Sequence, residues 1–126
     1  LVLGFLLAAL GIKLRFPGHP VAATWSVPIL VLGVPVLDTT LVILSRLRRG
    51  QPVWQGGKDH LSHRLVAGGL DRGRAVFTLY LLAGLAGAIA LQVSQSAPPV
   101  ANALFAAAAL AGLGWIAWLE WRGARE

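Results

Sequence analysis

Hydrophobic residues run in long blocks separated by short polar segments. The longest block, residues 75–119, holds 45 residues without Asp, Glu, Lys or Arg, whereas one helical crossing of a bilayer needs about 20 residues. The polar segment QVSQSAPPV, residues 92–100, contains a Pro-Pro pair that cannot continue a helix interior. The pattern therefore predicts two membrane spans, at about 75–92 and 100–119.

Two further blocks precede the basic centre of the chain. Residues 21–45 carry one charge, Asp38, between the turn-like RFPGHP and the basic SRLRRG, and they predict another span. The opening run, residues 1–14, would cover roughly 21 Å as a helix, which is short for a full crossing, and we expect its beginning to be lost. The fold class expected for residues 1–126 is an all-α, polytopic membrane helical bundle of about four transmembrane helices, forming part of a domain.

Composition agrees with this class, since 56% of residues are hydrophobic, 13% are charged and the mean hydropathy is +0.70. A typical soluble domain has about 25% charged residues. The net charge of +6 does not indicate a nucleic-acid partner here, because the cations lie between apolar runs. Cysteine is absent, so the chain offers neither disulfides nor thiolate metal ligands.

Seven of the eleven cations lie between residues 45 and 74. By the positive-inside rule the loop 45–73 is expected on the cytoplasmic side, and alternation of the spans puts the C-terminus there too. The segment containing Trp115, Trp118 and Trp121 would then lie near this boundary as an aromatic anchor.

Asp38 is an unusual residue for a membrane span. In a helix it would lie about 12 Å from Arg46, the start of the basic cluster at the end of the span. A carboxylate near mid-bilayer costs about 2.5 to 3.5 kcal/mol. One interpretation is a helix-capping Asp beside Pro35, with Thr39 and Thr40 satisfying loosened backbone groups. The other is that Pro35 breaks the span and Asp38 faces an aqueous cavity open to the cytoplasm.

The segment KDHLSHRL, residues 58–65, is the second such feature. A helix beginning near Asp59 would put His60 and Arg64 on one face, with His63 beside them. Three interpretations remain open: a solvated loop that binds anionic lipid, a metal site, or an anion-binding loop whose imidazoles and cations hold a phosphate or diphosphate. The metal site is the weakest, because the spacing matches no common pattern.

The order PVLDTT (35–40), SRLRRGQPVW (45–54) and KDHLSHRLVAGGLDRGRAV (58–76), followed by Tyr80, resembles the C-terminal part of the polyprenyl-phosphate N-acetylhexosamine 1-phosphate transferases. The opening LVLGFLLAALGIKL is similar to the helix that follows this superfamily's Gly-Asp-x-Gly-Ser element. The resemblance covers nearly the whole chain.

The resemblance implies an enzyme of the bacterial inner membrane that moves N-acetylhexosamine 1-phosphate from a UDP-sugar to undecaprenyl or another polyprenyl phosphate in cell-envelope polysaccharide biosynthesis, with magnesium. N-acetylglucosamine is favoured over the muramoyl pentapeptide, because the latter's loop carries three adjacent histidines. A homodimer is compatible with the resemblance. The substrate-binding residues that it implies are Asp38, Arg46, Asp59, His60, His63 and Arg64.

The sequence departs from the family's pattern in two places. The family's His-x-His-His-Arg motif has Ser62 in place of its middle histidine. The acids expected to bind magnesium and carry the catalysis lie in elements upstream of residue 1, and the five acids present include no adjacent pair. Residues 1–126 alone are therefore expected to be inactive. The alternative is a noncatalytic membrane protein whose basic loop binds anionic lipid or a partner.

Overall fold

The computed structural model of this 126-residue protein describes residues 2–13, 21–54, 57 and 60–123. Its helices are α1 (Val2–Lys13), α2 (Val21–Val31), α3 (Gly33–Arg48), α4 (Leu61–Ala67), α5 (Arg72–Gln95) and α6 (Pro98–Gly123). The described residues include no strand. The expected all-α membrane helical bundle is confirmed.

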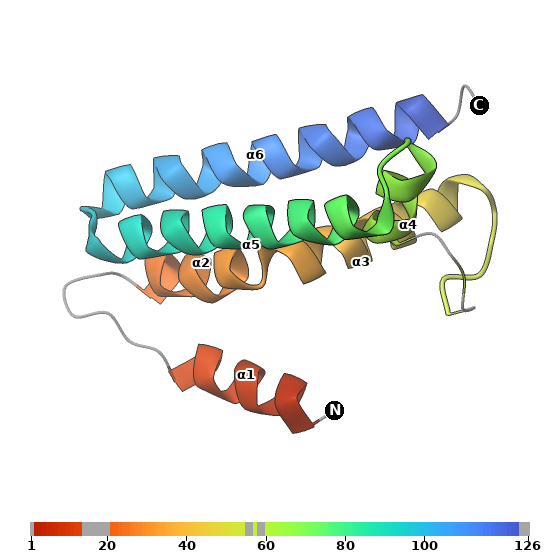
Figure 1. The fold of residues 1–126 in the computed structure, drawn as a ribbon. Coiled ribbons are helices and arrows are strands. Elements are labelled where there is room, and N and C mark those ends of the chain that lie inside the picture. The colour runs from red at the N-terminus through yellow and green to blue at the C-terminus, as the bar shows by residue number, and fades with distance from the viewer. Residues whose placement is uncertain (1, 14–20, 55–56, 58–59, 124–126) are drawn as a thin grey trace.

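Helices α5 and α6 lie side by side as the long antiparallel pair of the bundle (Figure 1). Each is long and apolar enough to cross a membrane. Pro98 and Pro99 begin α6, where the missing N–H groups cost nothing because first-turn donors have no partner within the helix. The Pro-Pro pair thus separates the two helices as the sequence indicated.

Helices α2 and α3 occupy the third apolar block and are bent by 74° at Leu32. Pro35 explains the break, because it cannot donate to the carbonyl of Val31 and its ring clashes with that carbonyl. The two helices together could form one broken span, which would bring the number of candidate spans among the described residues to three. The break predicted at Pro35 is therefore present.

Helix α1 lies at the edge of the bundle, against α2 (Figure 1). It has 12 residues, so its length of roughly 18 Å is too short for a full crossing. Its contact with the bundle runs through Gly11, where a Cβ atom would come within 3.3 Å of Pro28 Cβ. The exact span boundaries in a bilayer stay a prediction.

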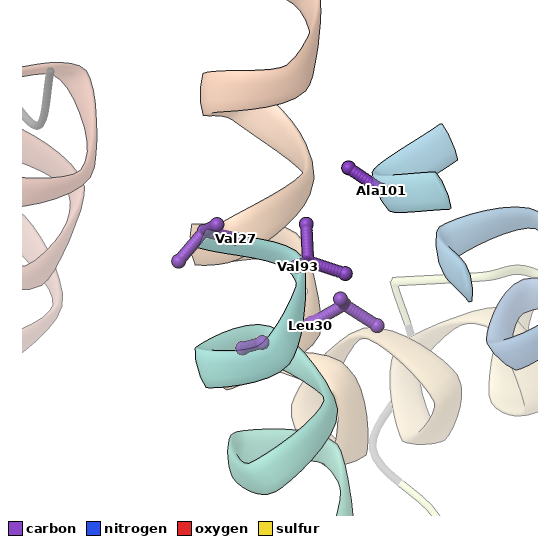
Figure 2. Packing of buried hydrophobic residues seen from close by; sticks show 5 residues of the cluster. Val27, Leu30, Val93 and Ala101 are labelled. Carbon is purple, nitrogen blue, oxygen red and sulfur yellow. The ribbon is translucent and has the colours of Figure 1, made fainter. Parts of the chain in front are cut away.

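An apolar cluster joins α2, α5 and α6 at the end of the bundle where α5 turns into α6 (Figure 2). Its buried members are Val27, Leu30, Ala90, Val93 and Ala101. Ala90 and Ala101 are small, which lets the helices approach closely, as is common in membrane bundles.

A second cluster lies at the opposite end, where α3 ends, α4 lies and α6 ends (Figure 1). Leu41, Leu61 and Ile116 are its buried residues, each at most 2% exposed. They come from α3, α4 and α6 respectively, so this cluster fixes the position of the short helix α4.

Candidate functional site

Helix α4 is the element that brings the predicted site residues together. It begins at Leu61, and His60 is its N-cap residue with an extended backbone, φ −65° and ψ 152°. The helix therefore begins at Leu61, later than the start near Asp59 that the sequence suggested. His60 precedes the helix because its side chain and the next backbone N–H are both held by Asp38.

Asp38 makes both of these contacts with one carboxylate. Its Oδ2 lies 2.8 Å from His60 Nδ1, and its Oδ1 accepts a hydrogen bond of 2.6 Å from the backbone N–H of Leu61. Asp38 thus supplies the side-chain cap of α4 from a different helix. Asp38 lies inside α3, so the helix that this helix-capping acid caps is α4 and not the one that carries it.

The contact with Asp38 also determines which nitrogen of the His60 ring carries a hydrogen. An ionised carboxylate only accepts hydrogen bonds, so Nδ1 must carry the hydrogen and donate it. Nε2 is then an acceptor in the neutral ring and a donor in the imidazolium. Since the His60 side chain is 52% exposed, the oriented imidazole is accessible to a ligand.

The backbone around Asp38 is satisfied locally. Thr39 Oγ1 donates to the carbonyl of Pro35 at 2.9 Å, and Thr40 Oγ1 donates to that of Val36 at 2.7 Å. These bonds lie in the first turns after the bend, as the sequence suggested for the two threonines. The carboxylate of Asp38 therefore remains available for α4.

Arg64 turns into the protein. Its Nη2 lies 2.6 Å from Ser45 Oγ on α3 and 2.6 Å from Glu120 Oε1 on α6. The Arg64 side chain is only 14% exposed, in contrast to that of His60.

Arg46 is also turned inward and is 5% exposed. Its Nη1 donates to the carbonyl of Val53 at 3.2 Å and approaches that of Pro52 at 3.5 Å. The guanidinium thereby holds the segment after α3 against the end of the helix.

Two glycines end the helices that frame the site. Gly50 follows α3 with φ +64°, and Gly69 follows α4 with φ +100°. In each case the residue after the glycine donates its backbone N–H to the carbonyl five residues earlier. Gln51 N–H donates to Arg46 O at 2.9 Å, and Leu70 N–H donates to Leu65 O at 3.2 Å. These are Schellman motifs, which favour glycine because other residues pay a steric cost at positive φ.

His63 lies on α4 with an exposed side chain and makes no hydrogen bond or ion pair with the described residues. Asp59, another predicted site residue, lies outside the described residues. The structure thus brings Asp38 and His60 into contact, leaves His63 accessible, and turns Arg46 and Arg64 inward.

Sequence reasoning missed Ser45 and Glu120. Ser45 looked like the start of a polar loop, yet it is fully buried on α3. Glu120 followed a chargeless run and looked like a membrane boundary, yet it is 8% exposed. The available signal was spacing, because Glu120 lies four residues after the buried Ile116 and so shares its helical face.

Metal binding can be tested against the same residues. Within the part of the chain that the structure describes, no group of three or more His, Asp or Glu side chains could hold a metal ion. Asp38 and His60 form only a pair, and both of Asp38's oxygens are engaged. These residues do not by themselves fit a magnesium ion.

An apolar groove of about 460 Å³ runs between α2, α3, α5 and α6. Leu37 and Thr40 of α3 line it, beside Ala86 of α5 and Gly112 of α6. Gly112 lies so close to α3 that a Cβ atom there would meet Leu37 Cδ2 at 2.9 Å. The groove thus begins on the same stretch of α3 that carries Asp38.

Comparison with known proteins agrees with the class defined by this fold and site, a polytopic membrane protein with a basic, histidine-bearing end. A Bacillus subtilis protein assigned as an undecaprenyl-phosphate N-acetylglucosaminyl 1-phosphate transferase is 43% identical over 56 residues, which are 44% of this chain and 16% of that protein. The decaprenyl-phosphate N-acetylglucosaminephosphotransferase of Mycolicibacterium smegmatis is 44% identical over 55 residues, 44% of this chain and 14% of its own length. The equally named protein of Mycobacterium leprae is 40% identical over 55 residues, with the same coverage.

Over 44% of its length the chain is therefore similar to polyprenyl-phosphate N-acetylglucosamine phosphotransferases, and the resemblance seen in its motifs is confirmed. The matched residues span less than a fifth of each of these relatives. No protein-family model matches the chain. No solved structure matches it significantly.

Proposed function

We propose that this chain is part of a membrane transferase that moves N-acetylhexosamine 1-phosphate from a UDP-sugar to a polyprenyl phosphate in cell-envelope polysaccharide biosynthesis. The observation that carries the proposal is the Asp38–His60 pair at 2.8 Å, which presents an oriented imidazole at the basic end of a membrane bundle. The names of the relatives support a polyprenyl phosphate acceptor and an N-acetylglucosamine group.

In this proposal, His60 and His63 contact the diphosphate of the donor. An imidazolium at either position makes charge-assisted hydrogen bonds to phosphate oxygens, and these are about twice as strong as neutral ones. Asp38 holds the His60 ring so that no ordering of the ring is needed when the donor binds. Ser62, the departure from the family motif, lies half-buried on α4 between them.

The orientation that we propose follows from the cations at this end. Arg48, Arg49, Arg64, Arg72 and Arg74 belong to the ends of α3, α4 and α5, which lie together beside the C-terminal end of α6 (Figure 1). By the positive-inside rule this end faces the cytoplasm of a bacterial inner membrane. A nucleotide sugar is available on that side.

The acceptor would lie with its apolar chain in the groove between α3, α5 and α6. The groove is almost wholly apolar, as an isoprenoid chain requires, and it reaches Leu37 and Thr40, one residue before and two residues after Asp38 in α3. Magnesium remains part of the proposal for the whole enzyme, where it would neutralise charge between the two phosphates. Because the described residues do not form its site, residues 1–126 alone should not catalyse the reaction.

The test is His63→Ala in the full-length protein, assayed by release of uridine monophosphate from UDP-N-acetylglucosamine with undecaprenyl phosphate and magnesium. Losing a charge-assisted hydrogen bond costs about 1.5 to 3 kcal/mol, so catalytic efficiency per folded molecule should fall by roughly 10-fold to 150-fold. The matched control is His19→Ala, in the polar segment predicted at the opposite face.

Equal damage from both changes, or near-normal efficiency of His63→Ala, would remove this loop from the donor site. If the full-length wild-type protein releases no uridine monophosphate, the noncatalytic alternative, a basic loop that binds anionic lipid, would take the place of the proposal.

A further inference from the structure

Glu120 is a buried acid near the C-terminal end of α6, in the apolar sequence WIAWLEW. Burying a carboxylate is costly unless an opposite charge compensates it. Arg64 supplies that charge, with Nη2 2.6 Å from Glu120 Oε1 and both side chains largely buried. Arg48 lies farther away, its Nη1 3.6 Å from Oε2, and its side chain is 61% exposed.

The Arg64 guanidinium already has two partners within the protein. Arg64 Nη2 donates a hydrogen bond to Ser45 Oγ at 2.6 Å and forms an ion pair with Glu120 Oε1 at the same distance. Turning this group toward a ligand would move the nearest compensating charge away from the buried carboxylate of Glu120. Arg64 is therefore suited to hold helices together rather than to bind an anion.

The first residue of α4 and Arg64, one turn further along, are both attached to one face of α3. Asp38, Leu41 and Ser45 stand at i, i+3 and i+7, which places them along one side of the helix over roughly 10 Å. Asp38 accepts a hydrogen bond from the backbone N–H of Leu61, the first residue of α4. Leu41 packs in the same apolar cluster as Leu61. Ser45 Oγ accepts a hydrogen bond from Arg64. Glu120 adds the attachment to α6.

We propose that Glu120 and Arg64 are positioning residues, which dock α4 between α3 and α6 and thereby set the positions of His60 and His63. This inference rests on the proposed function for its effect on catalysis, while the docking itself does not. It assigns Arg64 a different role from the direct substrate contact that its place in the motif suggested.

The experiment is a double-mutant cycle in the full-length protein with Glu120→Gln, Arg64→Gln and the double variant. Each single change removes the nearest opposite charge from a buried side chain, whereas the double change removes both charges. Each single variant should raise the KM for UDP-N-acetylglucosamine by about 10-fold or more, with a smaller change in kcat, and the double variant should recover most of the loss. Arg48→Gln is the matched control and should change little.

A double variant as defective as Arg64→Gln alone would overturn the proposal and make Arg64 a direct ligand of the donor. A second readout does not depend on activity: the rate at which a thiol reagent modifies Leu65→Cys in an otherwise cysteine-free background. Leu65 is 8% exposed on α4, so labelling should speed up in each single variant and slow again in the double variant.

Unchanged labelling in the single variants would refute the docking role whatever the kinetics show. If no version of the protein turns over the nucleotide sugar, the proposed function fails, yet the labelling rates of the same variants still decide whether Glu120 and Arg64 hold α4.

Discussion

The two ends of the bundle are held together by different interactions. At the α5–α6 turn, the helices meet through Val27, Leu30, Ala90, Val93 and Ala101, and the hydroxyls of α5 bond within their own helix, as Ser94 Oγ does with the carbonyl of Leu91. At the α4 end, polar side chains form hydrogen bonds and ion pairs between residues that are 19 to 56 positions apart in the chain.

Because of this difference, substitutions at the two ends of the bundle should affect different properties of the protein. Apolar packing is tolerant of similar residues because it has no direction. A network such as Asp38–His60 and Ser45–Arg64–Glu120 requires particular atoms at particular distances, and a missing partner leaves a buried polar group or charge. The α4 end should therefore be sensitive in activity, and the opposite end in stability alone.

The largest expected effect comes from truncating one buried side chain at each end. In the full-length protein, Leu41→Ala and Val93→Ala each truncate a buried side chain that does not line the groove. Both should destabilise the protein, Leu41→Ala by about 2–5 kcal/mol. Leu41 lies under α4, so only Leu41→Ala should also reduce kcat/KM per folded molecule. The measurements are thermal unfolding in detergent and the uridine monophosphate assay, and an equal loss of activity from both variants would contradict the comparison.

Asp38→Ala tests the directional contacts. It removes the acceptor of two hydrogen bonds, so kcat/KM should fall by about 10-fold to 150-fold, the equivalent of one charge-assisted bond. Asp71→Ala is the matched control, because Asp71 Oδ1 also caps a helix, accepting from Arg74 N–H at 3.0 Å. Its loss should cost about 1 kcal/mol of stability with little change in activity. Steady-state kinetics showing the reverse order would place the important carboxylate at α5.

Gly112→Val tests the close approach of α6 to α3. A side chain there would collide with Leu37, since even a Cβ atom would lie 2.9 Å from Leu37 Cδ2. Overpacking of this kind costs about 1–3 kcal/mol. Gly114→Val, two residues along α6, meets no atom within 4 Å of its Cβ position and should be better tolerated. Unfolding midpoints that fall equally would show that helix propensity, and not contact with Leu37, sets the cost.

The smallest expected effect concerns the end of α4. Gly69 has φ +100°, so Gly69→Ala should cost about 1–2 kcal/mol. Gly84→Ala, in the interior of α5 with nothing within 4 Å of its Cβ position, should instead stabilise the protein by about 0.5–1 kcal/mol. Opposite shifts of the unfolding midpoint are expected, and a stabilised Gly69→Ala variant would mean that α4 does not need its glycine terminator.

Much of the architecture was predictable from the sequence, because burial in a membrane requires long runs of apolar residues and each charge or proline within them stands out. The chargeless run 75–119 predicted two helices, and Pro35 predicted the break in the preceding span. The motif residues Asp38, His60, His63 and Arg64 were found by their chemical types. None of these inferences required knowledge of which side chains are in contact in the folded protein.

The tertiary structure alone decided the partners. It paired Asp38 with His60, turned Arg46 toward Pro52 and Val53, and joined Arg64 to Ser45 and Glu120. Glu120 is 56 residues from Arg64 in the chain, so no local pattern connects them. The physical reason is that apolar burial depends on residue type and leaves a periodic trace in one helix, whereas an ion pair depends on where two separate helices bring their atoms.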